Sequence, residues 1–197
     1  CKQTSKMLKD FDVKNKIISG DAIFAQTEIS RMVVEKGGEY LWKLRANQGK
    51  IYDLAKEHFK QMRDRYVGKS TDLDKGPGRI EKRKIVTSFR VTGAIEFPYA
   101  AQVFRISKKS TVIKTRKVRN QMIYGITSLP VEESGAAQLL DFTTQHWPLD
   151  NRLHYRRPVT SHADDARQTS LPGRPIMAAP HHLVIRTWRK TGLEHLA

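Results

Sequence analysis

The sequence predicts an α/β protein from the order of its apolar patterns. Short β-branched runs alternate with amphipathic helical patterns over roughly the first sixty residues, as they do in β-α-β units. Several short strand-like segments follow between about residues 76 and 129, and helical spacing returns after them. We therefore expect an α/β core, an antiparallel β-rich region inserted into it, and C-terminal helices.

The N-terminal part contains two predicted strands and two predicted helices. The run Ile17-Ile18 predicts a strand that is buried on both faces of a sheet. Residues 26–36 place apolar side chains at helical spacing and end in Gly37-Gly38, which is typical of a helix C-cap. A strand over residues 40–44 and a helix over residues 50–62 follow. This order implies parallel strands joined by right-handed crossovers.

The middle of the chain predicts an antiparallel region. Four segments read as its strands: residues 79–89, 101–107, 110–118 and 121–129. A helix is then expected over residues 133–145, with an apolar stripe of Ala136, Ala137, Leu139, Leu140 and Phe142. Another helix is expected from Pro148 to Tyr155, because proline suits the first turn of a helix.

The remaining tail is rich in Arg and His and is interrupted by prolines, so we expect it to be poorly ordered. These patterns predict three parts. Residues 1–75 form a partial core that carries Asp21, residues 76–130 form a basic β-rich insertion, and residues 131–197 form a C-terminal helical part with the tail.

The charge of the chain points to a polyanionic partner. There are 36 Lys and Arg against 20 Asp and Glu, a formal net charge of +16. Residues 75–119 hold thirteen of these cations and two acids, a net charge of +11. No apolar run approaches the roughly 18 residues that span a bilayer, so nucleic acid is a better partner than a membrane. Four aromatic residues lie among these cations, as core residues or as contacts to bases and sugars: Phe89, Phe97, Tyr99 and Phe104.

The single cysteine, Cys1, excludes an internal disulfide framework and suits a reducing compartment. We expect no signal peptide and a cytoplasmic, nucleoid-associated location.

Three acids are candidates for chemistry on DNA. Phosphodiester cleavage commonly uses two divalent ions held by carboxylates, and Mg²⁺ prefers oxygen ligands. Asp21 follows a strand, at the sheet edge where α/β proteins place ligands. Glu81 lies in GPGRIEKR, and Asp150 lies near the start of the expected helix at Pro148. Each has a structural alternative: Asp21 caps the next helix, Asp150 stabilises a helix dipole, and Glu81 is a solvated strand residue.

A family resemblance rests on six motifs in a fixed order: GDAIFAQTEI (20–29), GGEYLWKLRANQ (37–48), GRIEKR (78–83), AQVFRI (101–106), YGITSLP (124–130) and HWPLDNRLHY (146–155). Together they resemble the DDE transposases of bacterial insertion sequences, in the ISAs-type, H-repeat-associated branch. The similarity covers about residues 5–167 and, more weakly, the tail.

The resemblance implies an RNase H-like core that is interrupted by a β-rich insertion. It also implies an acid triad that uses two Mg²⁺ ions, or Mn²⁺, to cut and rejoin DNA. Asp21 matches the second acid of the family and Asp150 matches the third, so both are expected to be catalytic metal ligands. Glu81 lies in an HGRIE-like motif, with Pro77 in place of the usual histidine. It is a rival to the third acid, or it has a structural or DNA-facing role.

The chain also departs from the family pattern. HWGIEN reads HWPLDN here, so the shorter Asp150 replaces a glutamate. The first acid is absent and would lie upstream of Cys1, and RDVTFGED reads RPVTSHAD at residues 157–164. We therefore expect a truncated, decayed C-terminal portion that performs little or no strand transfer alone.

Eight polar or basic residues are predicted to contact DNA: Arg45, Asn47, Gln48, Arg79, Lys82, Arg83, Arg152 and Arg157. The alternatives are that Asn47 caps the helix at Lys50 and that the arginines after Asp150 form a solvated face. The expected partners are DNA, as element ends and target, and further copies of the protein in a synaptic complex, with no membrane.

A second hypothesis is a non-catalytic, basic DNA-binding remnant, in which the acids are structural. It predicts DNA binding that is indifferent to sequence and sensitive to salt. A basic ribosomal or membrane-surface protein explains neither the strand-acid-helix order nor the family motifs.

Overall fold

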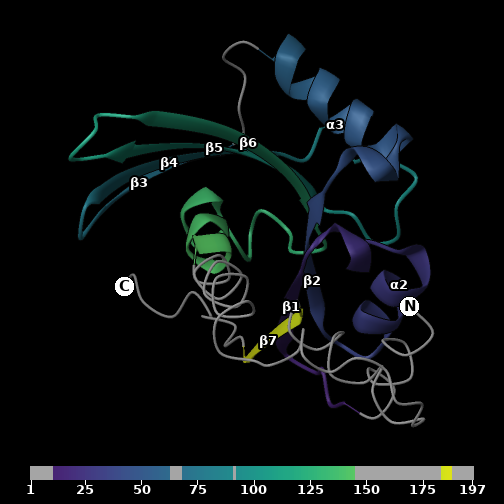
Figure 1. Ribbon diagram of the computed structural model, residues 1–197. Coiled ribbons are helices and arrows are strands. Elements are labelled where there is room, and N and C mark those ends of the chain that lie inside the picture. Colours follow the sequence, from purple (N-terminus) through teal and green to yellow (C-terminus); the bar gives the residue numbers. More distant parts are fainter. Residues whose placement is uncertain (1–10, 63–67, 91, 145–182, 188–197) are drawn as a thin grey trace, which may run out of the picture.

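One mixed sheet organises the molecule. The computed structural model describes residues 11–62, 68–90, 92–144 and 183–187. Within them, seven strands form a single curled sheet in the order β3-β4-β5-β6-β2-β1-β7 (Figure 1). The α/β class predicted from the sequence is confirmed at this level.

The N-terminal β-α-β unit forms as predicted. Strands β1 (Lys16–Gly20) and β2 (Glu39–Leu44) are parallel neighbours, and α2 (Thr27–Glu35) connects them. Ile29 and Val33 on α2 are fully buried against the sheet. The helix ends before Gly37, whose φ of +78° favours glycine, so the expected C-cap is confirmed.

A long antiparallel ribbon continues the same sheet. It comprises β3 (Gly68–Gly76), β4 (Arg79–Ser88), β5 (Gln102–Val112) and β6 (Val118–Thr127), and β6 pairs with β2. The parallel pairing expected of the two N-terminal strands and the antiparallel pairing expected of the middle region are both confirmed. Within the described sheet, β1 and β2 are the only parallel pair.

Two details of the ribbon differ from the predictions. Residues 110–118 were expected as one strand, but they end β5, form a turn and begin β6. Strand β3 was not expected, because its sequence GKSTDLDKG has one apolar residue and no alternating pattern. The division of the chain into three domains stays a prediction.

Helices cover both faces of the sheet (Figure 1). On one face, α2 and α3 (Lys50–Gln61) pack on a core that includes Tyr40 and Trp42. On the other, concave face, residues 136–144 form a helix whose Leu139 and Leu140 are buried. The predicted helices over 50–62 and 133–145 are thus confirmed in type. The second begins three residues late, and Ala137 of its predicted stripe is exposed.

The aromatic residues of the basic region divide between core and surface. Phe97 and Phe104 are buried, and the Phe104 ring lies over Gly125, where an added Cβ would come within 2.1 Å of the ring. Phe89 and Tyr99 are exposed. The core interpretation therefore holds for two of the four residues.

The tail contributes one strand to the structure. Residues of β7 (Leu183–Thr187) pair antiparallel with β1, and this strand was not predicted from the sequence. Its apolar run Leu-Val-Ile supplies the β-propensity that the preceding prolines obscured. The expected helix from Pro148 to Tyr155 lies outside the described residues. In the ranges that the structure describes, no helix is long and apolar enough to cross a membrane.

Candidate functional site

Asp21 and Arg45 meet at one edge of the sheet. Each directly follows a parallel strand, Asp21 after β1 and Arg45 after β2, so the two carboxyl strand ends bring them together. An Arg45 guanidinium nitrogen lies 3.0 Å from Asp21 Oδ2. The Asp21 side chain is 21% exposed and the Arg45 side chain 66% exposed. The predicted acid at a sheet edge is therefore present, with a cation that reaches it from solvent.

The carboxylate of Asp21 is not used as a helix cap. Asp21 occupies the N-cap position of a short 3₁₀ helix, η1 (Ala22–Phe24), but its side chain makes no cap hydrogen bond, and the Phe24 N–H donates to its backbone carbonyl at 2.9 Å. The capping alternative for its side chain is therefore wrong. Oδ1 is buried and has no hydrogen-bond partner among the described residues. One carboxylate oxygen is thus free to accept a ligand.

Packing fixes the backbone that carries Asp21. A Cβ at Gly20 would lie 2.8 Å from a Phe24 ring carbon and 2.9 Å from a Trp42 ring carbon. Trp42 itself is fully buried, and its indole N–H donates to Ser30 Oγ at 2.9 Å. Because residue 20 is a glycine, the rings of Phe24 and Trp42 can pack directly against the backbone at the end of β1.

Gln48 joins the two loops of this site. Its side-chain N–H donates to the Ala22 carbonyl, and its Oε1 accepts from the Arg45 N–H at 2.8 Å. This placement gives Gln48 a structural role beside Asp21. The N-cap residue of α3 is Gly49, at a φ of +44°. The prediction that Asn47 caps this helix is therefore wrong, because Asn47 lies two residues before the N-cap. The Asn47 side chain lies outside the described part of the structure.

Glu81 lies in a buried ion network on the concave face of the ribbon. Four groups contact its carboxylate: Arg79 Nε at 3.0 Å, Lys108 Nζ at 3.0 Å, Ser110 Oγ at 3.2 Å and an Arg83 guanidinium nitrogen. Arg83 also contacts Asp72 at 2.8 Å and Asp74 at 3.6 Å. The Glu81 and Arg83 side chains are each 5% exposed. The interpretation of Glu81 as a solvated strand residue is therefore wrong.

The buried ion network balances its own charge. It contains three acids and three cations, namely Asp72, Asp74, Glu81, Arg79, Arg83 and Lys108. Burial by itself raises the pKa of Glu81, but the hydrogen bond from Lys108 and the nearby positive charges outweigh burial and lower it overall. Because both oxygens of Glu81 already have donors, this geometry favours a structural role over metal binding.

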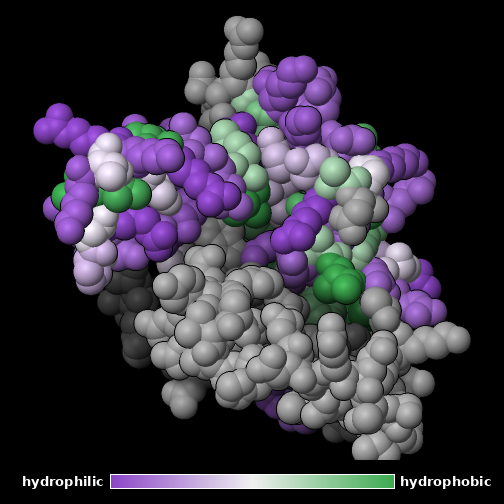
Figure 2. Space-filling view, in the orientation of Figure 1, coloured by the Kyte–Doolittle hydropathy of each residue, from purple (hydrophilic) through white to green (hydrophobic). Residues whose placement is uncertain are grey.

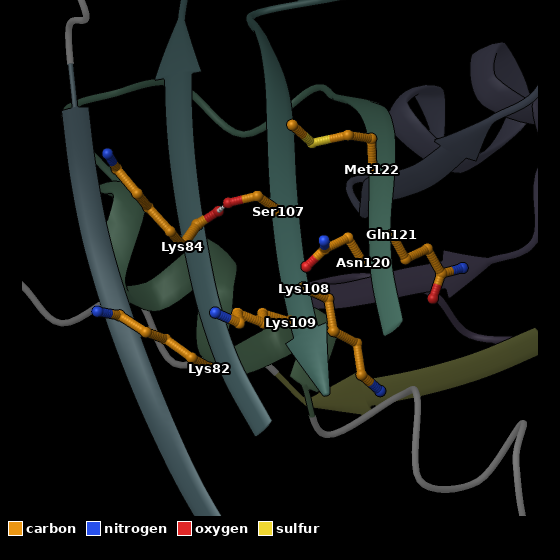
Figure 3. Close-up of a pocket in the computed structure, with 8 residues that line it drawn as sticks. All are labelled: Lys82, Lys84, Ser107, Lys108, Lys109, Asn120, Gln121 and Met122. Carbon is orange, nitrogen blue, oxygen red and sulfur yellow. Dashed lines mark hydrogen bonds between the residues drawn. The ribbon is translucent and has the colours of Figure 1, made fainter. Parts of the chain in front are cut away.

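The ribbon separates the basic residues predicted from the GRIEKR motif. Arg83 is buried in the ion network, and Arg79 is half-exposed and paired with Glu81. Lys82 points to the opposite face, where Lys84 and Lys109 accompany it (Figure 3). Lys84 and Lys109 were not among the predicted contacts. Strand alternation around Lys82 could have identified Lys84, but Lys109 requires the β4–β5 register.

The described residues do not assemble a complete metal site. Within the ranges that the structure covers, no three His, Cys, Asp or Glu side chains gather where they could hold one ion. Asp150, Arg152 and Arg157 lie outside the described residues. Their predicted roles therefore stay predictions.

Comparison with known proteins places the chain near bacterial mobile-element proteins. No protein-family model matches it. It is 24% identical over 188 residues to "Putative protein YbfL" of Escherichia coli K12 and 23% identical over 188 residues to "H repeat-associated putative transposase YhhI" of the same strain. Each match covers 91% of this chain and 49% of the relative. The chain is a distant homologue of H repeat-associated putative transposases.

A shorter match is closer in sequence. Over 80 residues the chain is 31% identical to "H repeat-associated putative transposase YbfD" of Escherichia coli K12. This match covers 40% of this chain and 32% of that protein. The chain spans about half the length of the curated relatives it matches over most of its own length.

Proposed function

We propose that this chain is part of a DDE transposase that cleaves DNA strands and joins them to target DNA with the help of divalent metal ions. The observation that carries the proposal is the buried Oδ1 of Asp21, which lies at the carboxyl end of a parallel strand and has no hydrogen-bond partner in the part of the chain that the structure describes. The distant homology to proteins named as transposases gives this acid its reaction class.

The chemistry of Asp21 suits a magnesium or manganese ion. Carboxylate oxygens are the ligands these ions prefer, and Oδ1 has no competing donor among the described residues. Asp21 would hold the ion, with Asp150 as the second ligand by resemblance. When bound, such ions stabilise charge on the attacking and leaving oxygens of a phosphodiester.

Arg45 has two uses at this site. Its guanidinium is two-thirds exposed and balances the charge of Asp21 through Oδ2. A guanidinium also matches the geometry of a phosphate and binds it through two hydrogen bonds. We infer that Arg45 turns from Asp21 to the DNA backbone when DNA and metal are bound.

The test is Asp21→Asn in the full-length parent protein. The amide keeps the size of the side chain but removes the negative charge that holds the metal, so Mg²⁺-dependent cleavage at the element's ends should fall by more than about 100-fold. Loss of outer-shell partners of a metal already costs about 10- to 100-fold. DNA binding in the absence of metal should not weaken.

The matched control is Asp53→Asn, which neutralises an exposed acid in the first turn of α3. Its cleavage rate should stay within about twofold of the parent. Equal cleavage by Asp21→Asn and the parent would remove Asp21 from the catalytic site.

The alternative function is a non-catalytic, basic DNA-binding remnant. This alternative is favoured by the lysines on the sheet face that carries Lys82, because no acid of strands β3 to β6 lies on that face. It predicts that the parent protein binds DNA but shows no metal-dependent cleavage, with or without Asp21→Asn.

A further inference from the structure

The two faces of the β3–β6 ribbon carry different charges. Residues directly opposite each other on antiparallel strands point to the same face, and alternate residues point to opposite faces. The strand registers therefore place all acids of β3, β4, β5 and β6, which are Asp72, Asp74 and Glu81, on the concave face with the buried ion network.

The opposite face of the ribbon carries cations without acids. We call it the lysine face, and its exposed or half-exposed lysines are Lys69, Lys75, Lys82, Lys84 and Lys109. Arg105 lies on the same face, but it donates to the Phe59 carbonyl at 3.2 Å beneath α3. Figure 2 shows hydrophilic side chains covering much of the visible surface at this end of the molecule, with a few hydrophobic ones among them.

The arrangement of these lysines is costly unless an anion binds them. Lys82 lies directly opposite Lys109 across β4 and β5, and like charges in that position destabilise a sheet. Lys84 is two residues from Lys82, about 7 Å along the strand. Within the described residues, none of Lys82, Lys84 and Lys109 has a carboxylate at ion-pair distance, in contrast to the paired cations of the concave face.

A hollow lies among these side chains. It has a volume of about 470 Å³ and is lined mainly by Lys82, Lys84, Ser107, Lys109, Asn120 and Met122 (Figure 3). The three lysines extend to one side of the sheet, whereas Lys108 points the other way, toward Glu81. Ser107 on β5 and Asn120 on β6 add neutral hydrogen-bonding groups beside the cations. This combination of lysine charges and small polar groups is typical of surfaces that contact the sugar-phosphate backbone.

We propose that the lysine face binds the phosphate backbone of duplex DNA without reading its sequence. Lysine acts on phosphate as a flexible point charge. Among the described residues, the hollow between Lys82, Lys84 and Lys109 is lined by side chains of β4, β5 and β6 alone, with no helix residue in it to enter a groove and reach base edges. The choice of DNA as the polyanion rests on the proposed function, but the binding surface does not depend on catalysis by Asp21.

The test compares two double variants of the 197-residue chain that each remove two positive charges. Lys82→Gln/Lys109→Gln acts on the lysine face. Lys14→Gln/Arg31→Gln acts on exposed cations near β1 and on α2. Binding to a short duplex of arbitrary sequence is measured by fluorescence anisotropy between about 50 and 200 mM salt, where counterion release makes affinity fall linearly on a log-log plot.

The lysine-face variant should bind more weakly, with a salt slope shallower by about 2, because each lost phosphate contact removes about 0.9 from the slope. The Lys14→Gln/Arg31→Gln control should keep the parent slope. Lys82→Arg/Lys109→Arg should restore it, because arginine keeps the charge. Unfolding curves of each variant show that the fold is retained, and the lysine-face variant should be no less stable than the parent.

A parent slope in the lysine-face variant, an equal loss in the control, or no DNA binding by the parent chain would each overturn the proposal. The outcome is separable from that of the proposed function. A full-length parent protein that binds DNA through this face but cleaves none would leave the inference standing and refute the catalytic role.

Discussion

Two acids in this molecule, Asp21 and Glu81, show how neighbours decide what a carboxylate can do. Asp21 directly follows a strand and has an exposed arginine on one carboxylate oxygen. Among the described residues its other oxygen has no partner. Glu81 lies in mid-strand, and four donors engage its two oxygens. The geometry at Asp21 leaves an oxygen available for a ligand at a modest cost in stability, whereas the geometry at Glu81 makes the carboxylate part of the folded structure. Three measurements test this difference between the two acids.

The largest expected effect is on stability when Glu81 is removed. Glu81→Ala leaves Arg83 and Lys108 buried with less compensation, and breaking a buried ion pair from one side costs about 3–5 kcal/mol. Urea unfolding should show this loss at pH 7. Ser110→Ala, which removes one hydrogen bond from a neutral hydroxyl to the Glu81 carboxylate, should cost less, about 1.5 kcal/mol. A loss of less than 1 kcal/mol for Glu81→Ala would mean that the network is a surface feature.

A smaller effect is expected from acid. The pKa of Glu81 is lowered in the folded state, so its ionised form stabilises the fold at every pH above the unfolded pKa of about 4.3. This stabilisation is lost as the pH falls from there through the pKa that Glu81 has in the folded protein. Stability of the parent should therefore decline below about pH 4.3. In Glu81→Gln, which starts less stable, the decline should be shallower. Parallel pH profiles for the two proteins would contradict this assignment.

The smallest effect on stability is expected at Asp21. Its ion pair with the exposed Arg45 is worth less than about 1 kcal/mol, as solvent screens such pairs. Asp21→Asn should therefore change the free energy of unfolding by less than that amount in either direction. A loss comparable to that of Glu81→Ala would make Asp21 a structural acid and weaken the catalytic proposal.

The sequence predicted the place of Asp21 in the fold better than that of Glu81. The β-branched run before Asp21 and the glycine pair after α2 define a β-α-β unit by local pattern, so the place of Asp21 at a sheet edge followed directly. The free Oδ1 and the partner Arg45 did not follow, because they depend on loop packing around Gln48.

The burial of Glu81 could not be predicted from its neighbours. Charged residues occupy both faces of the motif RIEKRK, so alternation gives no apolar side to assign to the core. The acids that pair with Arg83 come from β3, whose sequence lacks a strand pattern, and Lys108 comes from β5. Strand register, which is set by the whole sheet, brings them together.

The pairing of β6 with β2 has a mechanical consequence. An unbroken ladder of backbone hydrogen bonds runs from β4 and β5 through β6 and β2 to β1, so the ribbon is a stiff extension of the strand that carries Asp21. A duplex bound by Lys82 and Lys109 would be held at a fixed distance and angle from Asp21. The length of the ribbon would then determine which phosphodiester along the duplex reaches the end of β1.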